Sequence, residues 1–135
     1  MELFDDSARG GEPAHVDGVM LMSGFFSAAA PLPPGPRAYF GEDASLYEER
    51  SPLTHVRAVE TPIWLGVAEL DPGWIAQQTY AMARALTIAN GSSPSFHFFR
   101  GHNHVSTLHS LGSPQQDCGE EVLRALDAVI ARHPR

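Results

Sequence analysis

An aspartate and a histidine in this chain each follow an apolar segment that is typical of a buried strand. Asp71 comes just after the segment at 62–68, and His104 comes after the segment at 95–99. Parallel strands end at a common edge of their sheet, so we expect both side chains at that edge. A carboxylate beside an imidazole forms the acid–base half of a Ser-His-Asp triad. The pair therefore predicts hydrolysis through a nucleophile.

The nucleophile itself has no counterpart in the sequence. A nucleophile elbow has the pattern G-x-S-x-G, and residues 1–135 contain no such pentapeptide. Cys118 is a poor substitute, because it belongs to the start of a helix and no strand-turn-helix elbow surrounds it. Ser23 closes an apolar run and is expected to be structural. The chain reads as the acid and base half of a hydrolase.

Simpler roles for the two residues stay open. Asp71 precedes a proline at a strand-to-helix turn, where an aspartate often does no more than cap the helix. His104 would then be an ordinary loop histidine. Glu69 is an alternative acid, although a residue so close to the strand points less freely toward the site.

Several histidines near His104 raise the question of a metal site. His97, His102 and His109 lie close to it in the sequence. Zinc sites usually combine His or Cys pairs with a carboxylate at defined spacing, and nothing in this pattern completes one. We therefore expect no metal, and no other cofactor.

The elements that must position these residues alternate between strand and helix. Continuous apolar runs predict strands near 19–22, 62–68 and 95–99. The alternation predicts a parallel α/β sheet, with its three strands in the order of the sequence and helices flanking them. The strand near Val19–Met22 is apolar throughout, which is unusual for an exposed edge. We expect a missing upstream half, a partner chain or a homo-oligomer to cover it.

Apolar residues at spacings of three and four predict two long helices. The first is expected at about 73–90, with a stop at Asn90-Gly91. The second is expected at 114–132, with Ser113 as its cap and a proline at its first position. The prolines at 31–36 exclude helix in that loop, and short helical pieces are expected over 39–57.

Whole-chain numbers favour a soluble protein with a single domain over 1–135. The chain is 43% hydrophobic and 19% charged, and its net charge of −7 excludes nucleic acid and anionic membrane as main partners. No apolar stretch is long enough to span a bilayer. The first residues lack the basic segment of a secretory signal peptide, so we expect no secretion. With one cysteine, Cys118, these features predict a cytoplasmic location.

Five short segments, in this order and spacing, carry a family resemblance: Gly18–Gly24, Tyr39–Asp43, Ser51–Leu53, Val67–Pro72 with Gln77 or Gln78 downstream, and Asn103–Ser106. They resemble the C-terminal half of an α/β-hydrolase, in the small esterase group of feruloyl-esterase-like and arylformamidase-like enzymes. The resemblance implies a partial α/β-hydrolase fold, with Asp71 and His104 as catalytic acid and histidine. Phe25, Phe26 and Trp74 would stand beside that site and line a pocket for an acyl or aryl group.

The resemblance also implies a reaction, and it shows which parts needed for that reaction have no counterpart in this sequence. Members of this group transfer an acyl group to serine and then hydrolyse it, without a cofactor. Small esters, aryl esters and N-formyl aryl amides fit the group equally. The family's serine elbow and its H-G-G-type oxyanion loop have no counterpart here, so a fragment that is inactive alone is expected. The alternative is a non-catalytic interaction module that descends from a hydrolase and pairs its exposed strand with a partner.

Overall fold

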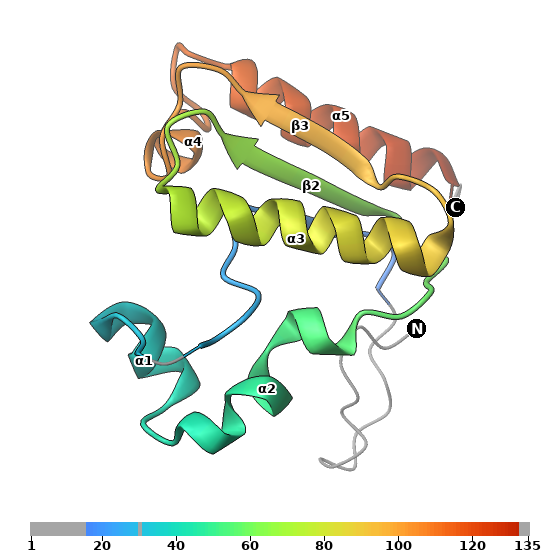
Figure 1. Ribbon diagram of the computed structural model, residues 1–135. Coiled ribbons are helices and arrows are strands. Elements are labelled where there is room, and N and C mark those ends of the chain that lie inside the picture. Colours follow the sequence, from blue (N-terminus) through green and yellow to red (C-terminus); the bar gives the residue numbers. More distant parts are fainter. Residues whose placement is uncertain (1–15, 30, 133–135) are drawn as a thin grey trace.

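A parallel sheet of three strands lies at the centre of the computed structural model, which describes residues 16–29 and 31–132. The strands, in spatial order, are β1 (Val19–Met22), β2 (Ile63–Ala68) and β3 (Ser95–Phe99). Both pairings are parallel, with Leu21 opposite Leu65 and Leu65 opposite Phe96. The strand positions, their order and their direction are as predicted. The carboxyl ends of the strands therefore share one edge, toward which the arrowheads of β2 and β3 point (Figure 1).

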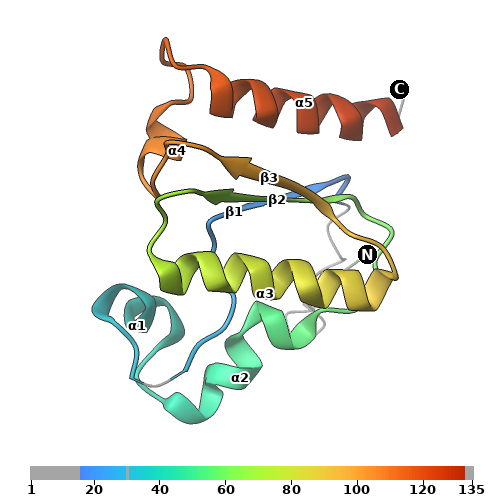
Figure 2. The same cartoon turned by 45° about the horizontal axis from the view of Figure 1, so that its top comes forward.

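Two long helices cover the two faces of this sheet (Figure 2). On one face lies α3 (Gly73–Asn90), and on the other lies α5 (Asp117–Arg132). The buried residues of α3 recur every three or four positions: Ile75, Thr79, Met82 and Leu86. This spacing turns one side of the helix toward the sheet. The helix ends at Gly91 in the left-handed conformation, with φ of 70°, as the Asn-Gly pair predicted.

The main core lies between the sheet and α3. It consists of five buried residues from three segments: Phe26, Ile63, Leu65, Met82 and Leu86. The central strand β2 is the most deeply buried of the three, and Leu65 and Val67 have no exposed surface. A continuous apolar strand of this kind needs cover on both faces. That cover comes from α3 and α5.

Between β1 and β2 the chain makes an excursion beyond α3 (Figures 1 and 2). It contains four short helices: α1 (Pro34–Phe40), η2 (Ala44–Leu46), α2 (Tyr47–Arg50) and η3 (Pro52–His55). A small second core of Leu32, Phe40 and Tyr47 holds this segment together. The predicted helical pieces over 39–57 are thus present.

The prediction that the prolines at 31–36 exclude helix was wrong. Helix α1 begins at Pro34 and includes Pro36. Both prolines lie in its first turn, where backbone N–H groups have no partner within the helix. A proline there gives up no hydrogen bond, and its fixed φ suits the helix.

The last helix begins three residues later than predicted. Ser113 does not cap it, because the Ser113 hydroxyl oxygen accepts a hydrogen bond from the Gln115 N–H at 3.1 Å and closes a local turn. Helix α5 then starts at Asp117. A single turn, α4 (Ser106–His109), precedes it. Within the described part of the chain, no helix has the length and apolar character that crossing a membrane requires.

Candidate active site

Asp71 lies in the tight turn that follows β2, with its carboxylate fully enclosed. The side chain has 0% of its surface exposed. Oδ2 accepts a hydrogen bond from the Ser23 hydroxyl at 2.6 Å and another from the Ala68 N–H at 2.8 Å. These two donors, from the ends of β1 and β2, set the orientation of the carboxylate and leave Oδ1 for a third partner.

That third partner is His104, on the loop that follows β3. Its Nδ1 lies 3.2 Å from Asp71 Oδ1, within the range of a hydrogen bond. The imidazole is 46% exposed. When Nδ1–H donates to the carboxylate, Nε2 carries the free lone pair on the other side of the ring. The structure thus brings the two side chains together at the carboxyl edge of the sheet, in the geometry that an acid–base pair needs.

The capping alternative for Asp71 does not describe this structure. The residue at the N-cap of α3 is Pro72, and no side chain there bonds to the first helical N–H groups. Glu69 does not contact the histidine either. Its carboxylate is exposed and accepts the Gly101 N–H at 2.7 Å, which ties the turn after β2 to the loop after β3. Of the two acids, Asp71 is the one that contacts His104.

Ser23 has a more direct part in this site than the sequence indicated. Its backbone has a φ of 46°, in the left-handed region that residues other than glycine rarely enter. Such a conformation costs on the order of 1–3 kcal/mol and persists only where surrounding contacts offset that cost. Here the Ser23 N–H donates to the Gly66 carbonyl at 2.9 Å, and its hydroxyl donates to Asp71. Since the hydroxyl contacts the acid and not the imidazole, Ser23 positions Asp71 and is not arranged as the nucleophile.

Removing this hydroxyl is expected to destabilise the fold measurably. We predict that Ser23→Ala lowers the free energy of unfolding by about 1.5–3 kcal/mol, because a buried carboxylate loses a charge-assisted partner. Ser27→Ala is the matched control, since Ser27 uses its backbone N–H and carbonyl to bond Gln78. Urea unfolding followed by circular dichroism measures both variants. Equal stability of the two variants would contradict the positioning role.

His102 anchors the loop that carries His104 to the neighbouring segments. The His102 carbonyl accepts the Leu70 N–H at 2.8 Å, next to Asp71. Its buried imidazole lies 3.2 Å from the Ser106 hydroxyl through Nδ1 and 2.9 Å from Asp117 Oδ2 through Nε2. This last contact lowers the pKa of the Asp117 carboxyl. His102 therefore joins the turn after β2, helix α4 and the start of α5.

The three predicted aromatic residues separate into a surface pair and a core residue. Phe25 packs edge-on against Trp74, with ring centroids 5.6 Å apart, and Trp74 is 47% exposed in the first turn of α3. Phe26 is buried in the main core. Gln78 fixes this segment, because its Oε1 accepts the N–H groups of Phe26 and Ser27 at 2.7 and 2.6 Å. Of the three, Phe25 and Trp74 are thus the residues with partly exposed rings, and they follow Ser23 and Asp71 by two and three positions.

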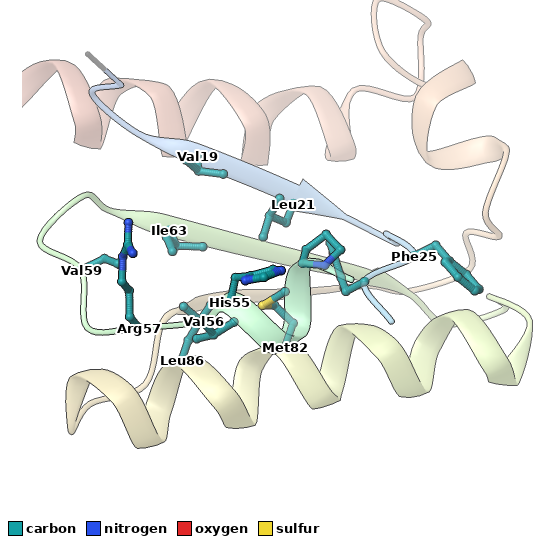
Figure 3. A pocket seen from close by; sticks show the side chains of 12 residues that line it. Val19, Leu21, Phe25, His55, Val56, Arg57, Val59, Ile63, Met82 and Leu86 are labelled. Carbon is teal, nitrogen blue, oxygen red and sulfur yellow. The ribbon is translucent and has the colours of Figure 1, made fainter. Parts of the chain in front are cut away.

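An apolar cavity lies apart from the acid–histidine pair. It has a volume of about 160 Å³ and lies between β1, η3 and α3, where Leu21, Ile63 and Met82 form much of its wall. Figure 3 shows His55 over the middle of this cavity and Phe25 at its end nearest the carboxyl edge of the sheet. Neither Asp71 nor His104 lines it. Phe25 thus both lines this cavity and packs against Trp74.

Comparisons with known proteins show which fold this chain shares with solved structures, but they do not assign it to a family. No family model matches the sequence, and no curated protein is significantly similar to it.

Solved structures of esterase 2 from the planctomycete Thermogutta terrifontis do share its fold. The butyrate-bound form superposes with a TM-score of 0.63 at 15% identity, covering 100% of this chain and 51% of that one. The apo form gives 0.62 at 17% identity, covering 90% and 44%. The form phosphoramylated by tabun gives 0.61 at 17%, covering 87% and 42%. The chain thus has a partial α/β fold of the kind found in these esterases and spans about half of their length.

Proposed function

We propose that this chain is the acid–histidine portion of a serine carboxylic-ester hydrolase. The observation that carries the proposal is the contact between Asp71 Oδ1 and His104 Nδ1 at the carboxyl ends of adjacent parallel strands. The esterase-like fold supports it, because active sites of open α/β sheets lie at that edge. The domain over 1–135 would then be one incomplete α/β-hydrolase domain.

In this proposal His104 moves the protons and Asp71 holds the ring. Nε2 of His104 would take the proton of a serine hydroxyl as its oxygen attacks the ester carbonyl. The imidazolium would return that proton to the alcohol as it leaves. A water molecule, activated by the same nitrogen, would then release the acid from the serine. Asp71 would stabilise each imidazolium and keep Nδ1 protonated between the steps.

The serine and its oxyanion donors have to come from residues outside this sequence. No G-x-S-x-G pattern occurs in residues 1–135, and Ser23 is engaged with the acid. We propose that the added part also covers β1. The strand pairs on one side with β2, and all four of its residues are half-buried.

The exposed face of α5 also supports the proposal that a further part of the protein covers the β1 edge. Three large apolar residues of α5 are exposed: Leu123 at 62%, Leu126 at 43% and Ile130 at 64%. Their neighbour Val129 packs over the start of β1, so closely that a Cβ at Gly18 would lie 2.7 Å from its Cγ2. An apolar helix face beside a strand edge that pairs with no other described strand is the surface that a further strand and helix would bury.

The substrate side of the proposal rests on the aromatic pair. Phe25 and Trp74 would form an apolar wall beside the acid–histidine pair, with Phe26 behind them in the core. This wall suits a small acyl or aryl group, as in the feruloyl-esterase-like and arylformamidase-like enzymes whose motifs the sequence resembles. Bound propionate and butyrate in the Thermogutta enzyme support a small acyl group.

The β1 edge also supports a second candidate function. A chain without a nucleophile that keeps an apolar edge and an exposed helix stripe is suited to bind another polypeptide. In this alternative the domain is a non-catalytic interaction module that descends from a hydrolase. Asp71 and His104 would then remain as structural relics of the ancestral site.

The two candidates differ in what completes the chain. We predict that the purified chain alone hydrolyses no p-nitrophenyl ester with saturation and takes no label from a fluorophosphonate, because the imidazole has no serine to activate. Adding a separately expressed polypeptide with an in-frame G-x-S-x-G, encoded upstream of Met1, should restore both signals. Labelling of the chain alone would reveal a nucleophile within it. Binding of a partner without turnover would favour the interaction module.

A further inference from the structure

A second group of reactive side chains lies behind the loop that carries His104. It consists of His102, from that loop, and Asp117 and Cys118, from the start of α5. One donor atom from each residue lies within 4.8 Å of the other two. His102 and Cys118 are 5% and 0% exposed, whereas the side chain of Asp117 is 60% exposed. The cluster therefore has a closed inner side and an open outer side.

The hydrogen bonds around this cluster already orient its donors. His102 Nδ1 lies 3.2 Å from the Ser106 hydroxyl, so Nε2 faces Asp117 Oδ2 at 2.9 Å. Metal-binding histidines usually use one ring nitrogen for the ion and the other for such an outer partner. Nitrogen and oxygen ligands at about 2.1 Å from a tetrahedral ion lie about 3.4 Å apart. Opening the His102–Asp117 contact by about half an ångström would thus make room for an ion.

We propose that His102 Nε2, the Asp117 carboxylate and the Cys118 thiolate bind a divalent ion of the zinc type. The mixture of nitrogen, oxygen and sulfur donors suits zinc, whereas magnesium and calcium prefer oxygen alone. A water molecule would take the fourth position on the open side, beside Asp117. Binding would release the thiol proton to solvent, since a thiolate is the ligand.

Such an ion would link the loop after β3 to α5. Its ligand on that loop, His102, lies two residues before His104. The His102 carbonyl also holds the turn that carries Asp71, through the Leu70 N–H. The ion would therefore brace the loop on which the acid–histidine pair depends. The inference does not require the proposed esterase function, since it rests on this cluster alone.

Cobalt binding to the full chain tests the site. Cys118 is the single cysteine of the sequence, so a thiolate-to-cobalt charge-transfer band can come from this residue alone. We expect one Co²⁺ per chain, with that band and the intense visible bands of tetrahedral coordination, and displacement by Zn²⁺. Cys118→Ser should abolish the charge-transfer band, and Asp117→Asn should weaken binding at least tenfold. His109→Asn, at an exposed histidine of α4, should change neither.

Two results would overturn the proposal. One is cobalt binding to the wild-type chain without a thiolate band, which needs no folded variant to observe. The other is binding that His109→Asn reduces and Cys118→Ser leaves unchanged, which would indicate adventitious binding to surface histidines.

Discussion

In the hydrolase that we propose, made of this chain and a part that supplies the serine, His104→Gln is expected to lower kcat by on the order of 10⁶-fold. Glutamine keeps the approximate size of the side chain but has no basic nitrogen to accept the serine proton. The side chain at 104 is 46% exposed, and the glutamine amide can donate to the Asp71 carboxylate in place of Nδ1–H, so the stability of the fold should stay nearly unchanged. Steady-state kinetics on a p-nitrophenyl ester measures the effect, and urea unfolding checks the fold.

His109→Gln is the matched control for this variant. His109 is an exposed histidine in α4, five residues further along the chain, and the histidine that bonds Asp71 is His104 instead. Its replacement should leave kcat within about twofold, as expected of a surface residue outside the site. A loss below tenfold in the His104 variant would reject His104 as the general base.

Asp71→Asn in the same completed enzyme is expected to lower kcat by about 10⁴-fold, the magnitude typical of a lost triad acid. The structure gives the reason. The site of Oδ2 receives two donors, the Ser23 hydroxyl and the Ala68 N–H, so the amide oxygen of asparagine will occupy it. The amide NH₂ then faces His104 Nδ1 and forces the ring to carry its proton on Nε2. In that tautomer the ring cannot accept the serine proton.

Glu69→Gln is the control for the acid. Glu69 lies two residues away, and its carboxylate bonds the Gly101 N–H instead of the histidine. Glutamine can still accept that hydrogen bond, so activity should stay near the wild-type value. A greater loss in the Glu69 variant than in the Asp71 variant would exchange the roles of the two acids. The ¹⁵N shifts of the His104 ring would report the tautomer directly.

The sheet and the acid–histidine contact could be predicted from local patterns. Apolar runs at 19–22, 62–68 and 95–99 are visible in a sequence, and the run of β2 is the most continuous because that strand is covered on both faces. Asp71 and His104 follow two of these runs directly. Since parallel strands end at one edge, residues that follow them are brought together by the topology itself.

The supports of the site could not be predicted in this way. Ser23 contacts Asp71 only because β1 ends in a left-handed turn beside the end of β2, and residue type alone does not indicate that turn. His102 meets Asp117 and Cys118 only because α5 folds back across the sheet. The predicted start of α5 was wrong for a related reason, since the Ser113 hydroxyl bonds within its own turn instead of capping the helix.

The α/β alternation, the parallel strands and the presence of acids and a histidine at the strand ends follow from the sequence alone, because burial and topology act on short, contiguous segments. The sequence also determined that no serine elbow lies in residues 1–135. The tertiary contacts were needed to show that Asp71 and not Glu69 faces His104, what holds Asp71 in place, and which donors gather around His102. These outcomes depend on hydrogen bonds between residues distant in the chain, and the direction of a side chain across such a distance is set by packing.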